Sequence, residues 1–283
     1  NLKEKRLDPK IAKVIIRACD DILKGKLDNQ FTVDIFQAGA GTSENMNVNE
    51  VIANRALELM HKKKGSYNII HPNDHVNLSQ STNDVFHSAI HMAAYLKIQK
   101  ELLPHIKKLE NALQQKAQKW KKVIKSGRTH LKDAIPMTLG QEFSGYAFMM
   151  RHDYDHVKDD AEYLRELNLG GTAIGTGINT TRNYKKNVFQ ELKKITKVPW
   201  KPAENLFEAT ASIGAIATGH ASLKVLAENL IKIANDLRLL SSGPATGFNE
   251  IELPAVQPGS SMMPGKENPA IAEIVDMVSF QVI

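Results

Sequence analysis

The sequence predicts an all-α protein dominated by a bundle of long helices. In residues 206–240, apolar side chains recur at alternating spacings of three and four residues, the heptad pattern of a long packed helix. Residues 88–118 and 138–168 also have helical composition, and few stretches alternate between apolar and polar residues as strands do. Long helices bury their apolar faces against similar neighbours, so these segments indicate a bundle.

The helix predicted over residues 206–240 would be about 50 Å long if it were unbroken. His220 interrupts its apolar seam, and an imidazole in that position is expected to lie in a core or an interface. The seam consists of Leu206, Ala209, Ile213, Ile216, His220, Leu223, Leu226, Leu230, Ile233, Leu237 and Leu240.

Three further helices complete the prediction. Pro104 is expected to kink or end the helix over residues 88–118, because proline removes a backbone donor. Residues 9–24 predict a shorter amphipathic helix. Its inward positions are Val14, Ile15 and Ile22. The broad apolar face of residues 138–168 consists of Leu139, Phe143, Tyr146, Met150, Val157, Ala161 and Leu164.

The composition is that of a soluble globular protein, with 42% hydrophobic and 24% charged residues in a chain of 283. No apolar run approaches the roughly 20 residues that cross a bilayer, and residues 1–10 are charged, so neither a membrane segment nor a signal peptide is expected. Cys19 is the single cysteine, which excludes an internal disulfide framework. We therefore expect a cytoplasmic protein with no membrane partner.

The net charge of +6 raises the question of nucleic-acid binding. The basic residues are scattered, apart from a short run at Lys62, Lys63 and Lys64, and no zinc-finger, RNP or helix-turn-helix pattern accompanies them. A solvated basic face is the favoured interpretation, so no nucleic-acid partner is expected. A modest positive field would also attract a small dianionic substrate.

Polar segments rich in Gly, Ser, Thr, Asn and His separate the predicted helices. One such segment would be read as a plain connection, but several between long rigid helices suggest loops that gather into a polar site. These segments are residues 37–49, 71–84, 126–136, 170–180 and 259–269.

The most informative segment is residues 259–269, which read Gly-Ser-Ser-Met-Met-Pro-Gly-Lys-Glu-Asn-Pro. Glycines and prolines at both ends suggest a mobile loop whose backbone N–H groups can face an anion, and the serines and the lysine supply an oxyanion and a positive charge. This segment closely resembles the signature GSSxMPxKxNP of the fumarase/aspartase superfamily. The segments at residues 39–47, 71–84, 127–130 and 170–176 resemble further superfamily motifs in the expected order.

The resemblance implies a fold and an assembly. It implies a partial N-terminal helical domain over residues 1–80 and a central long-helix bundle over residues 81–283, because superfamily members are longer than this chain. It also implies a homotetramer in which each active site draws loops from three subunits. No cofactor and no metal are implied for this chemistry, and no ligand set at metal spacing is evident. His71, Asp74 and His75 look like a metal cluster, but the resemblance makes them a polar segment.

The chemistry that the resemblance implies is elimination from a small dicarboxylate to release fumarate. The proton to be removed is a very weak acid, so the dianion that forms must be held by many preorganised donors. Ser260 would be the base, acting as an alkoxide stabilised by Lys266 and by backbone N–H groups. Lys266 and Asn268 would also hold one carboxylate of the substrate.

The resemblance assigns other residues to binding. Glu273 would pair with His130 and fix the orientation of its imidazole, which would lie near the leaving group with Asn83 and Thr129. The second carboxylate would be bound by hydroxyl and amide donors of Thr42, Ser81, Thr82 and Ser261. Taken singly, such threonines and serines are more often helix caps, and a helix N-terminus can serve both purposes.

The choice between two members of the superfamily remains open. Residues 37–43, 208–210 and 238–244 look more like aspartases, which act on L-aspartate, whereas Val48 is a residue that class II fumarases often carry. We expect an aspartase, with a class II fumarase as the alternative and a non-catalytic structural relative as a second one. Glu267 replaces a commonly apolar residue beside Lys266, where it would either draw the lysine away or face solvent.

Overall fold

The computed structural model describes residues 1–181 and 183–283, and 59% of the chain is helical against 7% strand. This confirms the predicted all-α class. The chain forms two compact units, one of residues 1–94 and 164–213 and the other of residues 95–163 and 214–283. A domain boundary between residues 80 and 81 stays a prediction.

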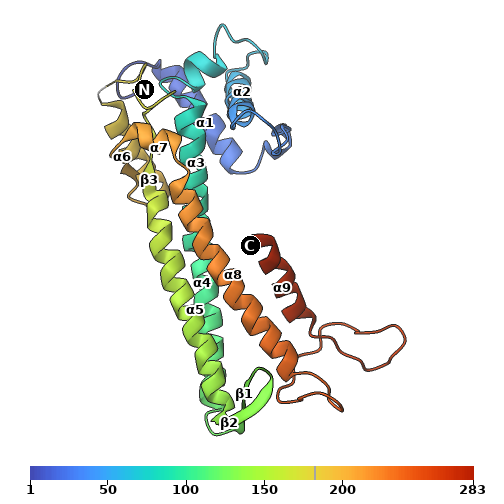
Figure 1. Cartoon of the computed structure of the whole chain (residues 1–283). Coiled ribbons are helices and arrows are strands. Elements are labelled where there is room, and N and C mark those ends of the chain that lie inside the picture. Colours follow the sequence, from blue (N-terminus) through green and yellow to red (C-terminus); the bar gives the residue numbers. More distant parts are fainter. Residues whose placement is uncertain (182) are drawn as a thin grey trace. The chain divides into compact units, whose positions relative to one another are not determined.

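The first unit is built on α1 (Pro9–Leu23) and α2 (Thr42–Leu59), which pack against each other (Figure 1). Asp8 caps α1, since its carboxylate accepts the backbone N–H of Lys10 at 2.7 Å. The core between the helices consists of Ala18, Ile52, Ala53, Ala56, Leu57 and Ile70. Val14, Ile15 and Ile22 pack against this core, which confirms the predicted apolar face of the first helix.

The remaining elements of the first unit are short, apart from the start of α3. They are η1 (Asp28–Gln30), the π-helical turn η2 (Pro72–Val76), the first part of α3 (Thr82–Lys97), β3 (Glu166–Leu167), α6 (Tyr184–Thr196), β4 (Lys201–Pro202) and α7 (Leu206–Ala211). β3 and β4 pair in parallel.

The second unit contains the long helices of the bundle. In Figure 1, α5 (Leu139–Ala161) runs alongside α4 (Leu103–Lys119) and α8 (Gly214–Leu240), and α9 (Ala270–Val282) packs on α8. A hairpin of β1 (Ile124–Thr129) and β2 (Lys132–Thr138) joins α4 to α5. The turns η3 (Ile98–Leu102) and η4 (Glu162–Arg165) flank these helices.

The predicted apolar face of residues 138–168 is confirmed. Its members Leu139, Phe143, Tyr146, Met150, Val157, Ala161 and Leu164 are all buried. Thr138 begins α5 with a capping box, in which its hydroxyl accepts the Gln141 N–H and the Gln141 side chain accepts the Thr138 N–H. Pro104 lies in the first turn of α4, directly after η3, so the helix changes character there as expected.

The prediction of a single helix over residues 206–240 is wrong, because this segment forms two helices. α7 ends at Ala211, Ser212 is extended with φ −94° and ψ 141°, and α8 begins at Gly214. Serine competes for backbone hydrogen bonds and glycine is a poor helix former, so Ser212 and Gly214 favour a break between the helices. Apolar spacing carries no information about such a break, and His220 is exposed in this chain.

Three of the segments expected to be loops contain regular structure, and in residues 71–84 this is η2 and the first turn of α3. α2 begins at Thr42, within the segment of residues 37–49. The segment of residues 126–136 forms most of the β1–β2 hairpin. The helix in residues 37–49 and the strands in residues 126–136 were not predicted, because neither of these polar segments shows a clear apolar period.

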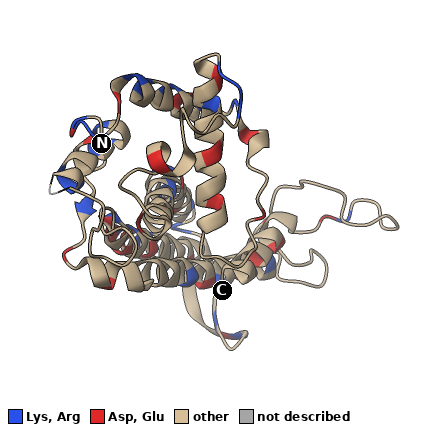
Figure 2. Cartoon of the chain, turned by 90° about the horizontal axis from the view of Figure 1, so that it is seen from above, with Lys and Arg blue, Asp and Glu red and all other residues tan. Residues whose placement is uncertain are grey.

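Basic and acidic residues are interspersed along the ribbon (Figure 2). Within the basic run, Lys64 lies 2.9 Å from the carboxylate of Glu58, so part of its charge is neutralised. Among the described residues, no helix combines the length and the apolar character that a bilayer span requires.

A histidine pair lies on α3. The rings of His87 and His91 meet edge to face with centroids 4.7 Å apart, and Nδ1 of His91 lies 3.1 Å from the Glu166 carbonyl oxygen. Burial lowers the pKa of both imidazoles, although the charge of Glu208 opposes this for His87. Both rings are therefore neutral in the folded chain near neutral pH.

This pair predicts acid sensitivity of the fold. A histidine with a lowered folded pKa contributes full stability above its unfolded pKa of about 6.5, and the contribution is lost as the pH falls through the folded pKa. His87→Phe keeps a ring but cannot titrate, so its urea midpoint is expected to fall less than that of the wild type between about pH 7.5 and 5. His220→Phe, at an exposed position, is the control and should follow the wild type. Equal pH dependence of His87→Phe and wild type would contradict the prediction.

Candidate active site

The loop of residues 259–269 presents Ser260 to two backbone donors. The Ser260 hydroxyl oxygen accepts the N–H groups of Met262 and Met263, each at 3.1 Å. Backbone donors aimed at a hydroxyl oxygen stabilise its anion more than its neutral form. This local geometry suits a serine that must act as a base.

Lys266 and Asn268 close the same loop. The Lys266 ammonium donates to the Asn268 side-chain oxygen, the Asn268 amide donates to the Gly259 carbonyl at 3.2 Å, and the Gly259 N–H donates to the Lys266 carbonyl at 2.9 Å. A Cβ at residue 259 would lie 2.7 Å from the backbone carbonyl oxygen of Lys266, so only glycine fits. Glu267 is exposed and, within the described chain, forms no ion pair with Lys266.

A cavity of about 840 Å³ adjoins this loop and is lined by Lys266, Asn268, Arg238 and Glu273, among others. Arg238 lies 3.9 Å from the Glu273 carboxylate and 3.1 Å from that of Asp276. Cationic and amide donors, which can bind a carboxylate, thus line the cavity together with the carboxylates of Glu252, Glu267 and Glu273.

His130 lies at the tip of the β1–β2 hairpin. His130 and Leu131 have φ values of 52° and 60°, and Thr129 pairs with Lys132, which defines a two-residue turn of the type that suits strand twist. His130 lines a different cavity, of about 300 Å³. No hydrogen bond or ion pair joins His130 to Glu273 within the described residues, so their pairing stays a prediction.

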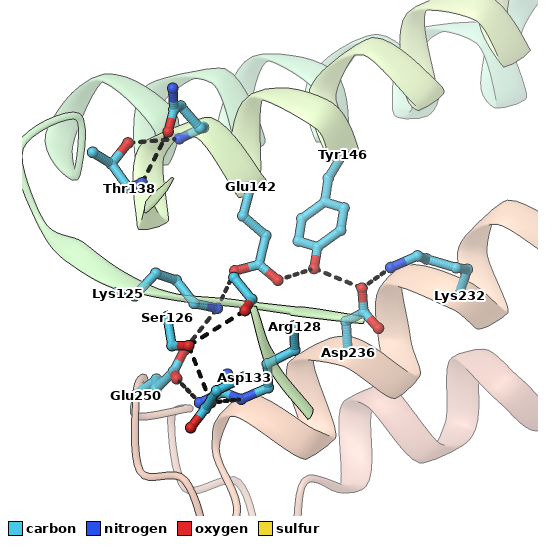
Figure 3. Close-up of polar contacts among 12 residues, drawn as sticks. Lys125, Ser126, Arg128, Asp133, Thr138, Glu142, Tyr146, Lys232, Asp236 and Glu250 are labelled. Atoms are coloured by element: carbon cyan, nitrogen blue, oxygen red, sulfur yellow. Dashed lines mark hydrogen bonds and ion pairs between the residues drawn. The ribbon is translucent and has the colours of Figure 1, made fainter. Parts of the chain in front are cut away.

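Charged side chains lie along this hairpin, from Lys125 near its base to Arg128 near its tip (Figure 3). The Lys125 ammonium lies between the carboxylates of Glu142 and Glu250, at 2.7 Å from the second, and Arg128 also donates to Glu250. Burial by itself would raise the pKa of Glu250, but the hydrogen bond from Arg128 and the charge of Lys125 outweigh it and hold the pKa below its ordinary value. Glu250 is therefore a carboxylate in the folded chain.

The network continues from Glu142 through Tyr146. The Tyr146 hydroxyl lies 3.0 Å from the Glu142 carboxylate and 2.7 Å from that of Asp236, which also receives Lys232. Burial, followed by the hydrogen bond to Asp236, raises the pKa of Tyr146, so its hydroxyl keeps its proton and donates. These contacts link α5 to α8.

In the first unit, Thr42 is the first residue of α2. The preceding Gly41 has φ 82°, and a Cβ there would lie 2.3 Å from the ring of Phe86. Glycine is therefore required for both its backbone conformation and its close approach to the ring. This places the Thr42 hydroxyl at a helix N-terminus, where backbone N–H groups favour an anion.

Ser81 directly precedes α3, which begins with Thr82 and Asn83, and the next residue, Asp84, organises this segment. The fully buried Asp84 carboxylate accepts the Ser81 N–H at 2.9 Å, and the N–H groups of Gly170 and Thr172 at 2.9 and 3.0 Å. Burial raises the pKa of Asp84, and these hydrogen bonds oppose the rise. Asp84 thus joins two polar segments of the first unit.

Asp84 and Glu250 were not among the predicted site residues. Ser81 and Asp84 have the Ser-x-x-Asp spacing of a capping box, which was a usable signal. No local pattern marks Glu250, because its partners are far away in the sequence. Asn83 donates to the Ala173 carbonyl at 2.6 Å, which strengthens the same junction.

His71 and His75, which resemble part of a metal cluster in the sequence, accept hydrogen bonds from backbone N–H groups. Nδ1 of His71 accepts the N–H groups of Asn73 and Asp74 at 3.1 and 3.2 Å and caps η2, while the His71 N–H donates to Nδ1 of His75 at 2.8 Å. Over the described part of the chain, no group of three or more His, Cys, Asp or Glu side chains is arranged to hold a metal ion.

The expected site residues thus lie in both units. Thr42, Ser81, Thr82 and Asn83 belong to the first unit. The second unit contains Thr129, His130, Ser260, Ser261, Lys266, Asn268 and Glu273. Within it, Ser260, Lys266 and Asn268 share one loop, whereas His130 lines another cavity. Their joint action in one site stays a prediction.

Residues 1–283 match the family model described as Lyase. The chain belongs to this family, and its relatives confirm the resemblance to the fumarase/aspartase superfamily. It is 53% identical to the aspartate ammonia-lyase of Helicobacter pylori and 50% identical to that of Bacillus subtilis, over 98% and 100% of this chain. It is 47% identical to the class II fumarate hydratase of H. pylori, over 100% of this chain. The chain spans about 60% of the length of these curated relatives, at 59% to 61%.

Solved structures show the same likeness. The fold matches a crystal structure titled fumarate lyase:delta crystallin from Brucella melitensis bound to cobalt, with TM-score 0.94 and 50% identity over 100% of this chain and 61% of that one. It matches the class II fumarase of Schistosoma mansoni with TM-score 0.96 and 39% identity, over 100% and 62% of the two chains.

Proposed function

We propose that the protein is an aspartate ammonia-lyase, which eliminates ammonia from L-aspartate to give fumarate. The observation that carries the proposal is the loop of residues 259–269, in which Ser260 faces two backbone donors and Lys266 adjoins Asn268. The 53% and 50% identity to aspartate ammonia-lyases supports the choice of substrate.

The mechanism assigns proton abstraction to Ser260. The alkoxide removes the proton from the carbon next to one carboxylate, and the resulting dianion is stabilised by Lys266 and Asn268. The second carboxylate binds among Thr42, Ser81, Thr82 and Ser261. Expulsion of ammonia from the neighbouring carbon then gives fumarate. Asn83, Thr129 and His130 lie near the leaving group, with Glu273 orienting His130.

In this proposal the protein is a homotetramer in the cytoplasm, and each of its active sites contains loops of different subunits. Within the second unit, His130 lines a different cavity from Lys266 and Asn268, which supports a site that takes residues from more than one subunit. Light scattering of the full chain should give four times the mass of the subunit. A monomer with full activity would contradict the shared site.

Class II fumarase is the second candidate, because the chain is 47% identical to one fumarate hydratase and matches another at TM-score 0.96. Fumarate formation, followed by ultraviolet absorbance with the full chain, separates the two. We expect turnover of L-aspartate and none of L-malate. Turnover of malate alone would make the protein a fumarase, and no turnover of either by a folded protein would leave a structural role.

A further inference from the structure

The β1–β2 hairpin carries Thr129 and His130 but has little support of its own. Its two strands form a two-stranded sheet with each other. An isolated two-stranded hairpin is marginally stable in water, and its direction is not fixed by its own hydrogen bonds. The position of His130 therefore depends on side chains that tie the hairpin to its neighbours in the second unit.

The contacts that attach the hairpin to its neighbours converge on the side chain of Glu250. Lys125 and Arg128, both on β1, contact the two oxygens of its carboxylate (Figure 3). The Lys125 side chain is 8% exposed, so its charge is poorly solvated and depends on its partners. The Arg128 guanidinium also lies 4.0 Å from the ring centroid of Phe248, two residues before Glu250.

Glu250 is itself anchored to α8. Its backbone N–H donates to the carbonyl of Leu240, the last residue of α8, at 2.8 Å, and the Ile251 N–H reaches the same carbonyl at 3.3 Å. Glu250 therefore connects a rigid helix end to two cations of the hairpin. Arg128 is two residues from His130, so the connection is made next to the hairpin tip.

We propose that Glu250 is a positioning residue, which fixes the β1–β2 hairpin through Lys125 and Arg128 and so holds His130 in place for the reaction. The role of His130 in the reaction rests on the proposed function, whereas the fixing of the hairpin does not. Without the Glu250 charge, Lys125 keeps only the carboxylate of Glu142, and Arg128 keeps only the exposed carboxylate of Asp133, at 3.8 Å.

Glu250→Gln in the full chain tests the proposal, because glutamine keeps the shape and removes the charge. We expect kcat for fumarate formation to fall about tenfold or more, since small misplacements of catalytic groups have effects of this size. The KM should change much less. Hydrogen–deuterium exchange of the peptide covering residues 124–138 should become faster. Loss of stability alone would not lower kcat of the folded enzyme.

Asp133→Asn is the matched control on the same hairpin. The Asp133 side chain is 80% exposed and lies 3.8 Å from Arg128, so kcat and exchange should stay close to the wild type. If Glu250→Gln does not fold, Glu250→Asp keeps the charge with a shorter reach and should show smaller changes in the same direction. Unchanged exchange, or kcat within about twofold of wild type, in the folded variant would overturn the proposal.

The same experiment separates the two claims. A wild-type protein that makes no fumarate from aspartate or malate refutes the proposed function. Faster exchange of residues 124–138 in Glu250→Gln, but not in Asp133→Asn, would still establish the hairpin tie. Unchanged exchange in an active enzyme refutes the positioning role alone.

Discussion

Ser260→Ala is expected to lower kcat for fumarate formation from L-aspartate about a thousandfold, the size of effect attributed to a general base. Alanine removes the only atom that can accept the substrate proton in the proposed mechanism. The hydroxyl accepts two backbone N–H groups of its own loop, at 3.1 Å each, so the loss also leaves these donors without a partner. Steady-state kinetics of the full chain measure the effect.

Two serine variants serve as comparisons. The Ser144 hydroxyl donates to the Gln141 carbonyl of its own helix at 2.7 Å, so Ser144→Ala should keep kcat within about twofold. Ser261→Ala removes a proposed carboxylate ligand and should raise KM more than it lowers kcat. A Ser260→Ala enzyme with wild-type kcat would show that another group takes the proton.

Asp84→Asn is expected to lower the free energy of unfolding by about 3 kcal/mol, because it breaks a buried hydrogen-bonded group. The carboxylate accepts three backbone N–H groups, and an amide of the same shape turns one acceptor into a donor. At least one buried N–H then faces another donor. The change should also raise KM, since Ser81 loses the contact that fixes it. Urea unfolding and steady-state kinetics together measure these effects.

Asp20→Asn is the control for this variant. Asp20 is exposed on α1, so its replacement should change the urea midpoint little. Equal midpoints for Asp84→Asn and wild type would show that Asp84 does not hold the segments at Ser81 and Gly170 together.

Local sequence was enough for much of the fold. The face of α5 and the inward residues of α1 follow from apolar spacing, because a helix repeats every 3.6 residues whatever its surroundings. The break at Ser212 and the start of α2 at Thr42 were missed, because each depends on a few backbone hydrogen bonds and not on a long period.

The loop of residues 259–269 could also be predicted from local sequence. Its glycines, serines and lysine are adjacent in sequence, so the contacts of Ser260, Lys266 and Asn268 form within a few residues. The predicted pairing of His130 with Glu273 has no such local basis.

The helical class, the apolar faces and the chemical character of the loops follow from the order of the amino acids alone. Which distant residues pack against them depends on how the chain folds in three dimensions. Asp84 meets Gly170 across 86 positions, and Arg128 meets Glu250 across 122. Periodicity and motifs are properties of neighbouring residues, whereas a buried charge finds its partner only when the chain has brought separate segments together.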